Sequence, residues 1–202
     1  AMIMRIAMLS AISWLIQIKT TLFNVNLDWF SSDISIQAII LLAGGLFLLY
    51  KSTLEIFQKV EDIEEGPINK NLKSISYSRA LFQIILIDIV FSFDSILTAV
   101  GMTNGIPYAL WIMIISVIVS IIIMMSFAAP VSRYINKHPS LQILGLSFLL
   151  LIGFMLIAES AYLSNTTFFG SSIGRIPKGY LYFSITFSLG IEMINMRIRK
   201  RK

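Results

Sequence analysis

The chain contains, at residues 86–104, the apolar stretch LIDIVFSFDSILTAVGMTN, in which two carboxylates are embedded. Its first half is almost entirely isoleucine, leucine, valine and phenylalanine, yet Asp88 and Asp94 lie within it. Apolar runs of this length are typical of helices that cross a membrane. A carboxylate at the centre of such a helix costs about 2.5–3.5 kcal/mol on insertion scales, and it usually faces a bundle interior or a water-filled cavity. The stretch therefore predicts a membrane fold that contains an ion or proton path.

The composition of the whole chain agrees with a membrane protein. Of its 202 residues, 56% are hydrophobic and only 13% are charged, whereas soluble domains are about 25% charged. The mean hydropathy is +0.81. A water-soluble fold would have too little interior to hide this much apolar surface. Cysteine is absent, which excludes disulfides and thiolate metal sites.

Six apolar segments approach the roughly 20 residues that a membrane-spanning helix requires. They are residues 2–23, 35–57, 80–103, 107–130, 140–162 and 179–196, the last being marginal in length. Prolines lie at or just before three of the expected helix starts, at Pro107, Pro139 and Pro177, and we expect Pro130 to end a helix. The sequence thus predicts an all-α, polytopic membrane bundle that forms a single domain over residues 1–202.

The basic residues predict the orientation. If successive segments alternate across the membrane, 13 of the 16 lysines and arginines lie on the side of the N-terminus. The other three are Lys19, Arg175 and Lys178. Since positive residues are retained on the cytoplasmic side, we expect a cytoplasmic C-terminus. Residues 58–79 would then form a solvated cytoplasmic loop, whose acidic start can also gather cations at a pore mouth. Residues 197–202 would form a basic cytoplasmic tail beside anionic lipid.

Helical spacing divides the polar side chains around the two aspartates into two faces. At 100° per residue, Ser92 and Ser95 share a face with Asp88, whereas Thr98 shares another face with Asp94. The two aspartates are about 120° apart around an ideal helix and about 9 Å apart along it, so a straight helix would not let both bind one small ion directly. Either the helix is broken near Ser92–Ser95, or each aspartate belongs to a separate sub-site.

Two further acids in apolar runs are candidates for a secondary transport path, together with Thr98. Glu159 lies near a helix end on the expected outer side, where simple hydration explains it equally well. Glu192 lies deeper, with serines at i−8 and i−4 on the same face, and a structural role is equally open for it.

The ligand chemistry of these segments consists of oxygen donors. The single histidine, His138, lies in an expected cytoplasmic turn, and zinc, copper and nickel sites favour cysteine or histidine. Oxygen donors suit Mg²⁺, Ca²⁺ or Mn²⁺, and monovalent cations or protons stay open. The sequence holds no Ser/His/Asp arrangement, HExxH motif or phosphate loop, so we expect no enzyme and no permanently bound cofactor. The basic tail has no accompanying aromatic or groove-reading motif, so we expect no nucleic-acid partner.

The pattern DIVFSFDSILTAVG resembles the second signature of the TerC family of integral membrane proteins, in which an aspartate is followed by Phe-Ser and then Asp-Ser on a membrane helix. The matching positions are Asp88, Phe91, Ser92, Asp94 and Ser95. Other stretches agree in order with the riboswitch-linked bacterial branch: MRIAMLSAISWL, LLAGGLFLLYKSTLEI, HPSLQILGLSFLLLIGF and IPKGYLYFSITFSLGIEMIN. The resemblance covers essentially the whole chain.

This resemblance implies a transporter of divalent metal cations in the bacterial inner membrane, chiefly an exporter of Mn²⁺. Asp88 and Asp94 would then be metal ligands or a proton-accepting pair, and Ser92 and Ser95 would supply nearby oxygens. The expected partners are the lipid bilayer, the transported divalent cation, and either a second copy of the chain or another membrane subunit.

One departure from the family pattern supports a different hypothesis. The family has seven helices, and its first carries an acidic residue and an Asp-Asn pair that would precede Ala1. The six segments here therefore correspond to a chain without that helix. On this ground a second hypothesis is a non-transporting membrane scaffold or accessory subunit of another transport or secretion system. A third hypothesis, which does not depend on the missing helix, is a proton-coupled carrier of a small solute.

Overall fold

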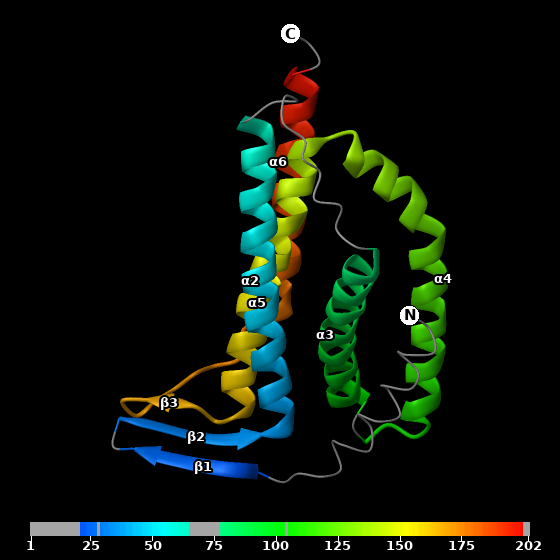
Figure 1. Ribbon diagram of the computed structural model, residues 1–202. Coiled ribbons are helices and arrows are strands. Elements are labelled where there is room, and N and C mark those ends of the chain that lie inside the picture. Colours follow the sequence, from blue (N-terminus) through cyan, green and yellow to red (C-terminus); the bar gives the residue numbers. More distant parts are fainter. Residues whose placement is uncertain (1–20, 28, 65–76, 104, 200–202) are drawn as a thin grey trace.

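The protein is seen here in a computed structural model that describes residues 21–27, 29–64, 77–103 and 105–199. The described elements run in the following order: β1 (Thr21–Leu27), β2 (Phe30–Ser35), α2 (Ile36–Glu64), α3 (Tyr77–Thr103), α4 (Ala109–Asn136), α5 (Pro139–Leu163), β3 (Thr167–Phe168), β4 (Ser171–Ser172) and α6 (Lys178–Arg199). Successive helices run in alternating directions, and the strands lie at one end of the bundle (Figure 1).

Four helices are long and apolar enough to cross a membrane: Ile36–Glu61 within α2, Leu81–Thr103 within α3, and the whole of α4 and α5. They confirm the predicted helical spans at 35–57, 80–103, 107–130 and 140–162, and with them an all-α polytopic fold. The predicted segment 179–196 is helical as part of α6, but α6 does not belong to this apolar group, because polar side chains within it, Glu192 and Asn195 among them, lower its mean hydropathy. Six spans are therefore not found among the described residues.

The segment predicted at 2–23 is wrong at its end. Residues 21–23 begin strand β1 instead of completing a helix, while residues 2–20 lie outside the described part of the chain. β1 and β2 form an antiparallel hairpin, to which β3 and β4 add in the order β1-β2-β3-β4. Two hydrogen bonds between hydroxyl groups link β2 to the segment that follows α5. Ser31 Oγ lies 2.6 Å from Thr167 Oγ1, and Ser32 Oγ lies 3.1 Å from Thr166 Oγ1.

The expectation that Pro130 ends a helix is also wrong. α4 continues through Pro130 to Asn136. Proline removes one backbone hydrogen bond and crowds the preceding turn, but membrane helices tolerate it, so that it can bend a helix without ending it. α4 is accordingly curved along its length (Figure 1).

The tightest packing joins α2 to α5, which lie side by side in Figure 1. Two adjacent glycines of α2 each allow a different helix to approach α2 closely. A Cβ added at Gly45 would lie 2.8 Å from the carbonyl oxygen of Gly153 on α5, and one added at Gly44 would lie 2.8 Å from Val90 Cγ1 on α3. Small residues allow helix backbones in membranes to approach this closely. α3 is thereby held against the α2–α5 pair.

The buried apolar core lies between these helices and reaches α4. It is formed by Leu41, Leu48, Val90, Phe93, Ile96, Met113 and Leu156. Three of its members come from the middle of α3, the helix that carries the two aspartates. Their burial fixes the rotation of α3, and with it the direction in which its polar side chains face.

Candidate functional site

α3 is one uninterrupted helix from Tyr77 to Thr103. Of the two arrangements that helical spacing left open, a helix broken near Ser92–Ser95 is therefore wrong, and the alternative, in which each aspartate belongs to a separate sub-site, stays a prediction. Asp94 and Thr98 line a cavity toward α5 and α6, while Ser92 lines another cavity toward α4. Asp88 is half-buried and lines neither of these two cavities.

The side chain of Asp94 is held by a lysine from the start of α6. Lys178 Nζ lies 2.6 Å from Asp94 Oδ2, and it donates a second hydrogen bond of 2.7 Å to Thr98 Oγ1. Thr98 in turn donates its hydroxyl proton to the backbone carbonyl of Asp94 at 2.9 Å. The side chains of Lys178 and Asp94 are 23% and 22% exposed, so the pair is largely shielded by protein.

A second acid faces the same cavity from α5. Glu159 has a side chain that is only 12% exposed, and Arg175 Nε lies 3.3 Å from its Oε1. The cavity measures about 350 Å³, and Asp94, Glu159 and Lys178 all line it. Ser95 and Tyr182 add hydroxyl groups to walls that are otherwise apolar. Two carboxylates and two basic side chains therefore meet beside one cavity, where their formal charges cancel.

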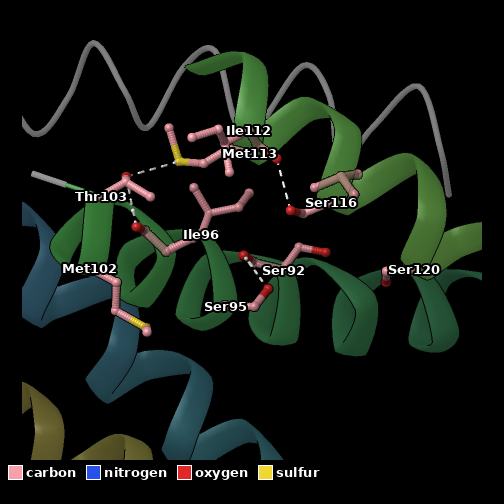
Figure 2. Close-up of a pocket in the computed structure, with 11 residues that line it drawn as sticks. Ser92, Ser95, Ile96, Met102, Thr103, Ile112, Met113, Ser116 and Ser120 are labelled. Carbon is pink, nitrogen blue, oxygen red and sulfur yellow. Dashed lines mark hydrogen bonds between the residues drawn. The ribbon is translucent and has the colours of Figure 1, made fainter. Parts of the chain in front are cut away.

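A hydroxyl-rich cavity lies on the other side of α3, against α4. It measures about 320 Å³, and five of its lining residues carry hydroxyl groups: Ser92, Ser95, Thr103, Ser116 and Ser120. Figure 2 shows Ser116 of α4 across the cavity from Ser92 and Ser95 of α3, with Met102 and Met113 nearer one end. Ser95, Ala99 and Met102 line both cavities, so the two cavities lie on either side of the same stretch of α3.

Ser92 is the most enclosed polar group in this second cavity. The residue is 2% exposed, and its Oγ has no hydrogen-bond partner among the described residues. Ser95 Oγ donates to the backbone carbonyl of Ser92 at 3.1 Å instead of to its hydroxyl. A buried hydroxyl without a partner carries a desolvation cost of about 1–3 kcal/mol. Its oxygen is available to a ligand or to water.

Comparison with known proteins connects this architecture with a defined group. The sequence pattern described as the integral membrane protein TerC family matches residues 1–202. The chain belongs to the TerC family. It is 39% identical over 202 residues to the UPF0053 inner membrane protein YgdQ of Escherichia coli (strain K12), covering 100% of this chain and 76% of that protein.

Other UPF0053 proteins align over the same region. The UPF0053 protein of Haemophilus influenzae (strain ATCC 51907 / DSM 11121 / KW20 / Rd) is 40% identical over 200 residues, which cover 76% of its length. The UPF0053 inner membrane protein YoaE of Escherichia coli (strain K12) is 38% identical over 200 residues, but these cover only 35% of it. No solved structure matches the chain. The family and the helices together identify a multi-pass inner-membrane protein.

The structure brings together some of the site residues predicted for this TerC protein and separates others. Asp94, Ser95, Thr98 and Glu159 line one cavity, whereas Ser92 faces the other and Glu192 lines neither. Among the described residues, no three histidine, cysteine or acidic side chains form a group that could hold a metal ion. The roles of Asp88, Asp94, Ser92 and Ser95 as metal ligands therefore stay predictions.

Sequence reasoning did not find Lys178 as a site residue. Lys178 and Asp94 are 84 positions apart in the chain, and no local sequence pattern indicates that two such distant residues form a pair. A weak signal was present, because Lys178 and Arg175 are two of the three basic residues that the charge distribution places on the opposite side from the other 13. Basic residues that break the expected charge asymmetry are candidates for pairing with acids in the membrane.

Proposed function

We propose that this TerC-family protein transports a divalent metal cation across the inner membrane, with export of Mn²⁺ as its specific reaction. The observation that carries the proposal is the Asp94 carboxylate, which lies in an apolar span, faces a cavity, and already binds a cationic group there at 2.6 Å. Acids in membrane spans that face cavities usually mark ion or proton paths. The proposal includes no enzymatic step and no resident cofactor.

The chemistry of the cavity supports a hard cation as the substrate. Its polar lining groups are carboxylate and hydroxyl oxygens from Asp94, Ser95, Thr98, Glu159 and Tyr182, together with the Lys178 ammonium. Carboxylate and hydroxyl oxygens suit Mg²⁺, Ca²⁺ and Mn²⁺. The preference for Mn²⁺ and the direction of export both rest on the family resemblance. The partners are the bilayer, the cation, and a second copy of the chain or another membrane subunit; no nucleic acid is included.

A second candidate function is a non-transporting scaffold or accessory subunit of another membrane system. The ion pairs favour it, because Asp94 and Glu159 are each neutralised by a basic side chain of the same protein. Paired acids of this kind can serve structure alone. This reading predicts a stably copurifying membrane protein and no metal flux in liposomes that contain only this chain.

The deciding experiment replaces Asp94 by asparagine, which keeps the shape of the side chain and removes its charge. We expect Asp94→Asn to abolish Mn²⁺ resistance in cells that lack other Mn²⁺ exporters, and to abolish Mn²⁺ flux in liposomes, at unchanged membrane abundance. The matched control is Asp33→Asn, which makes the same change in an acid of β2 that lines neither cavity and should leave flux unchanged. Wild-type flux at the level of empty liposomes would overturn the transport proposal in favour of the scaffold.

A further inference from the structure

We propose that Lys178 is a tethered counter-cation, which occupies the cation site on Asp94 when no metal is bound and exchanges with the metal ion during transport. The inference rests on the proposed function and deepens it, because it assigns to one side chain the control of affinity and release. Lys178 lies outside the TerC signature that pointed to Asp94, and its role follows from the geometry of the cavity.

The ammonium group of Lys178 is bound by two acceptor oxygens on one face of α3. Asp94 Oδ2 lies 2.6 Å from Nζ, and Thr98 Oγ1 lies 2.7 Å from it. Thr98 donates its own proton to the carbonyl oxygen of Asp94 at 2.9 Å, so its hydroxyl presents only lone pairs to the ammonium. Two acceptors one helical turn apart form a small oxygen site for a cation.

The same oxygens are the ones that a metal ion would need. A divalent cation takes carboxylate and hydroxyl oxygens as ligands, and it cannot use Asp94 Oδ2 and Thr98 Oγ1 while the ammonium holds both. Entry of the metal therefore requires Nζ to leave. The side chain is 23% exposed and carries its charge on a flexible four-carbon stem, so it can move without unfolding the helix.

The place of Lys178 in the chain suits such a movement. It is the first residue of α6 and directly follows Pro177, at the end of a stretch from Ile173 to Pro177 that has no helix or strand. The stem thus begins at a helix end, where the backbone is free of the constraints of a helix interior. Arg175, which does not itself line the cavity, pairs with Glu159 at 3.3 Å between Nε and Oε1. Asp94 is then the carboxylate that Lys178 neutralises.

The exchange has two physical consequences. When the site is empty, the ammonium keeps the Asp94 carboxylate paired, and an unpaired buried charge is strongly destabilising. When metal is present, the ammonium competes for the same oxygens, which lowers the apparent affinity for the metal in proportion to the fraction of sites that Lys178 occupies. A transporter must release its ion, so this competition favours turnover over tight binding.

The first test measures Mn²⁺ binding by the full chain in lipid nanodiscs, with the unbound Mn²⁺ quantified by its electron paramagnetic resonance signal. Lys178→Met removes the charge and keeps the length of the side chain. We expect it to bind Mn²⁺ about tenfold more tightly than wild type, which corresponds to 1.4 kcal/mol, and to release it more slowly in flux assays. Lys178→Arg keeps a cation on Asp94 and should bind no more tightly than wild type.

A charge-matched control separates exchange from general electrostatics. Arg175→Met removes an equal positive charge at the same end of α6, but it leaves the ammonium on Asp94. It should tighten Mn²⁺ binding much less than Lys178→Met. Equal tightening in the two variants, or affinity in Lys178→Met no greater than in wild type, would overturn the inference while wild-type flux still upholds the proposed function.

A second test uses the wild-type chain and so does not depend on whether Lys178→Met folds. An amine-reactive acetylating reagent is applied with and without saturating Mn²⁺, and acetylation at Lys178 is quantified by mass spectrometry against Lys51 and Lys59 as internal references. We expect Mn²⁺ to raise labelling of Lys178 alone, because the ammonium leaves Asp94. Labelling that falls or stays constant overturns the exchange; if wild-type flux is also absent, the proposed function fails with it.

Discussion

Gly45 of α2 and Gly153 of α5 bring the backbones of these two helices into direct contact. A Cβ added at Gly45 would lie 2.8 Å from the carbonyl oxygen of Gly153, and one added at Gly153 would lie 3.1 Å from the carbonyl oxygen of Gly45. In a bilayer, apolar side chains gain little from leaving lipid, so close backbone packing supplies much of the attraction between helices. The α2–α5 pair is thus the part of the fold most sensitive to added volume.

Gly45→Ala should therefore destabilise the protein. The new methyl group would contact backbone atoms of α5, which cannot move aside as a flexible side chain can, and overpacking of this kind costs about 1–3 kcal/mol. We expect a lower midpoint of thermal unfolding in detergent. Gly145→Ala is the matched control, since it lies in α5 with nothing within 4 Å of the added Cβ, and it should leave the midpoint unchanged or raise it. Equal effects of the two substitutions would contradict the close contact.

Ser160→Ala should weaken the same helix pair by a smaller amount. Ser160 Oγ donates a 2.7 Å hydrogen bond from α5 to the backbone carbonyl of Ala38 on α2, and both residues are buried. Interhelical hydrogen bonds in membranes contribute on average about 0.6 kcal/mol, with a maximum of about 1.7 kcal/mol. Ser147→Ala is the control, because its hydroxyl bonds only within α5, to Ile143 at 2.9 Å. Unfolding midpoints that coincide for the two variants would refute the role of Ser160.

The two ion pairs of the cavity should differ in strength. Arg175 is 50% exposed, so screening by solvent limits its pair with Glu159 to the range of about 0.2–1 kcal/mol that exposed pairs show. Both partners of the Asp94–Lys178 pair are less than a quarter exposed, and their interaction is screened less. The coupling energy of each pair can be obtained from the free energies of unfolding in a double-mutant cycle. One cycle uses Glu159→Gln and Arg175→Gln, and the other uses Asp94→Asn and Lys178→Gln. We expect the larger coupling energy for Asp94–Lys178. The opposite order would contradict this view of the cavity.

The four apolar spans found among the described residues were predictable, because a long apolar segment in a bilayer has few alternatives to forming a helix. The ends of the helices were less so. α2 continues to Glu64, about two turns past the predicted end at residue 57, because charged residues outside an apolar span can still extend a helix. α4 continues through Pro130 because the flanking apolar residues keep the chain helical.

The sheet and the lysine contact were beyond sequence reasoning for a different reason. β2 is fastened to β3 by pairs such as Ser31 with Thr167, which are 136 positions apart, and serine and threonine at these positions carry no local signal of pairing. The lysine contact was missed for the same reason. The spacing of residues 86–104 correctly placed Asp94 and Thr98 on one face of α3, but it holds no information about a residue 84 positions away. Only the three-dimensional structure shows that Lys178, at the start of α6, reaches that face of α3, because α6 itself packs against α5.

The orientation of the bundle can be tested with single cysteines, since the chain has none of its own. Lys137 follows α4 at the end of the bundle where α6 finishes, and Ser171 lies in β4 at the opposite end (Figure 1). Both residues are exposed. Because basic residues gather at the end that includes Lys137, we expect that end to face the cytoplasm. A membrane-impermeant maleimide should label Ser171→Cys in intact spheroplasts and Lys137→Cys only after permeabilisation. Full labelling of both variants after permeabilisation is the control, and labelling of Lys137→Cys alone in intact spheroplasts would place the C-terminus outside.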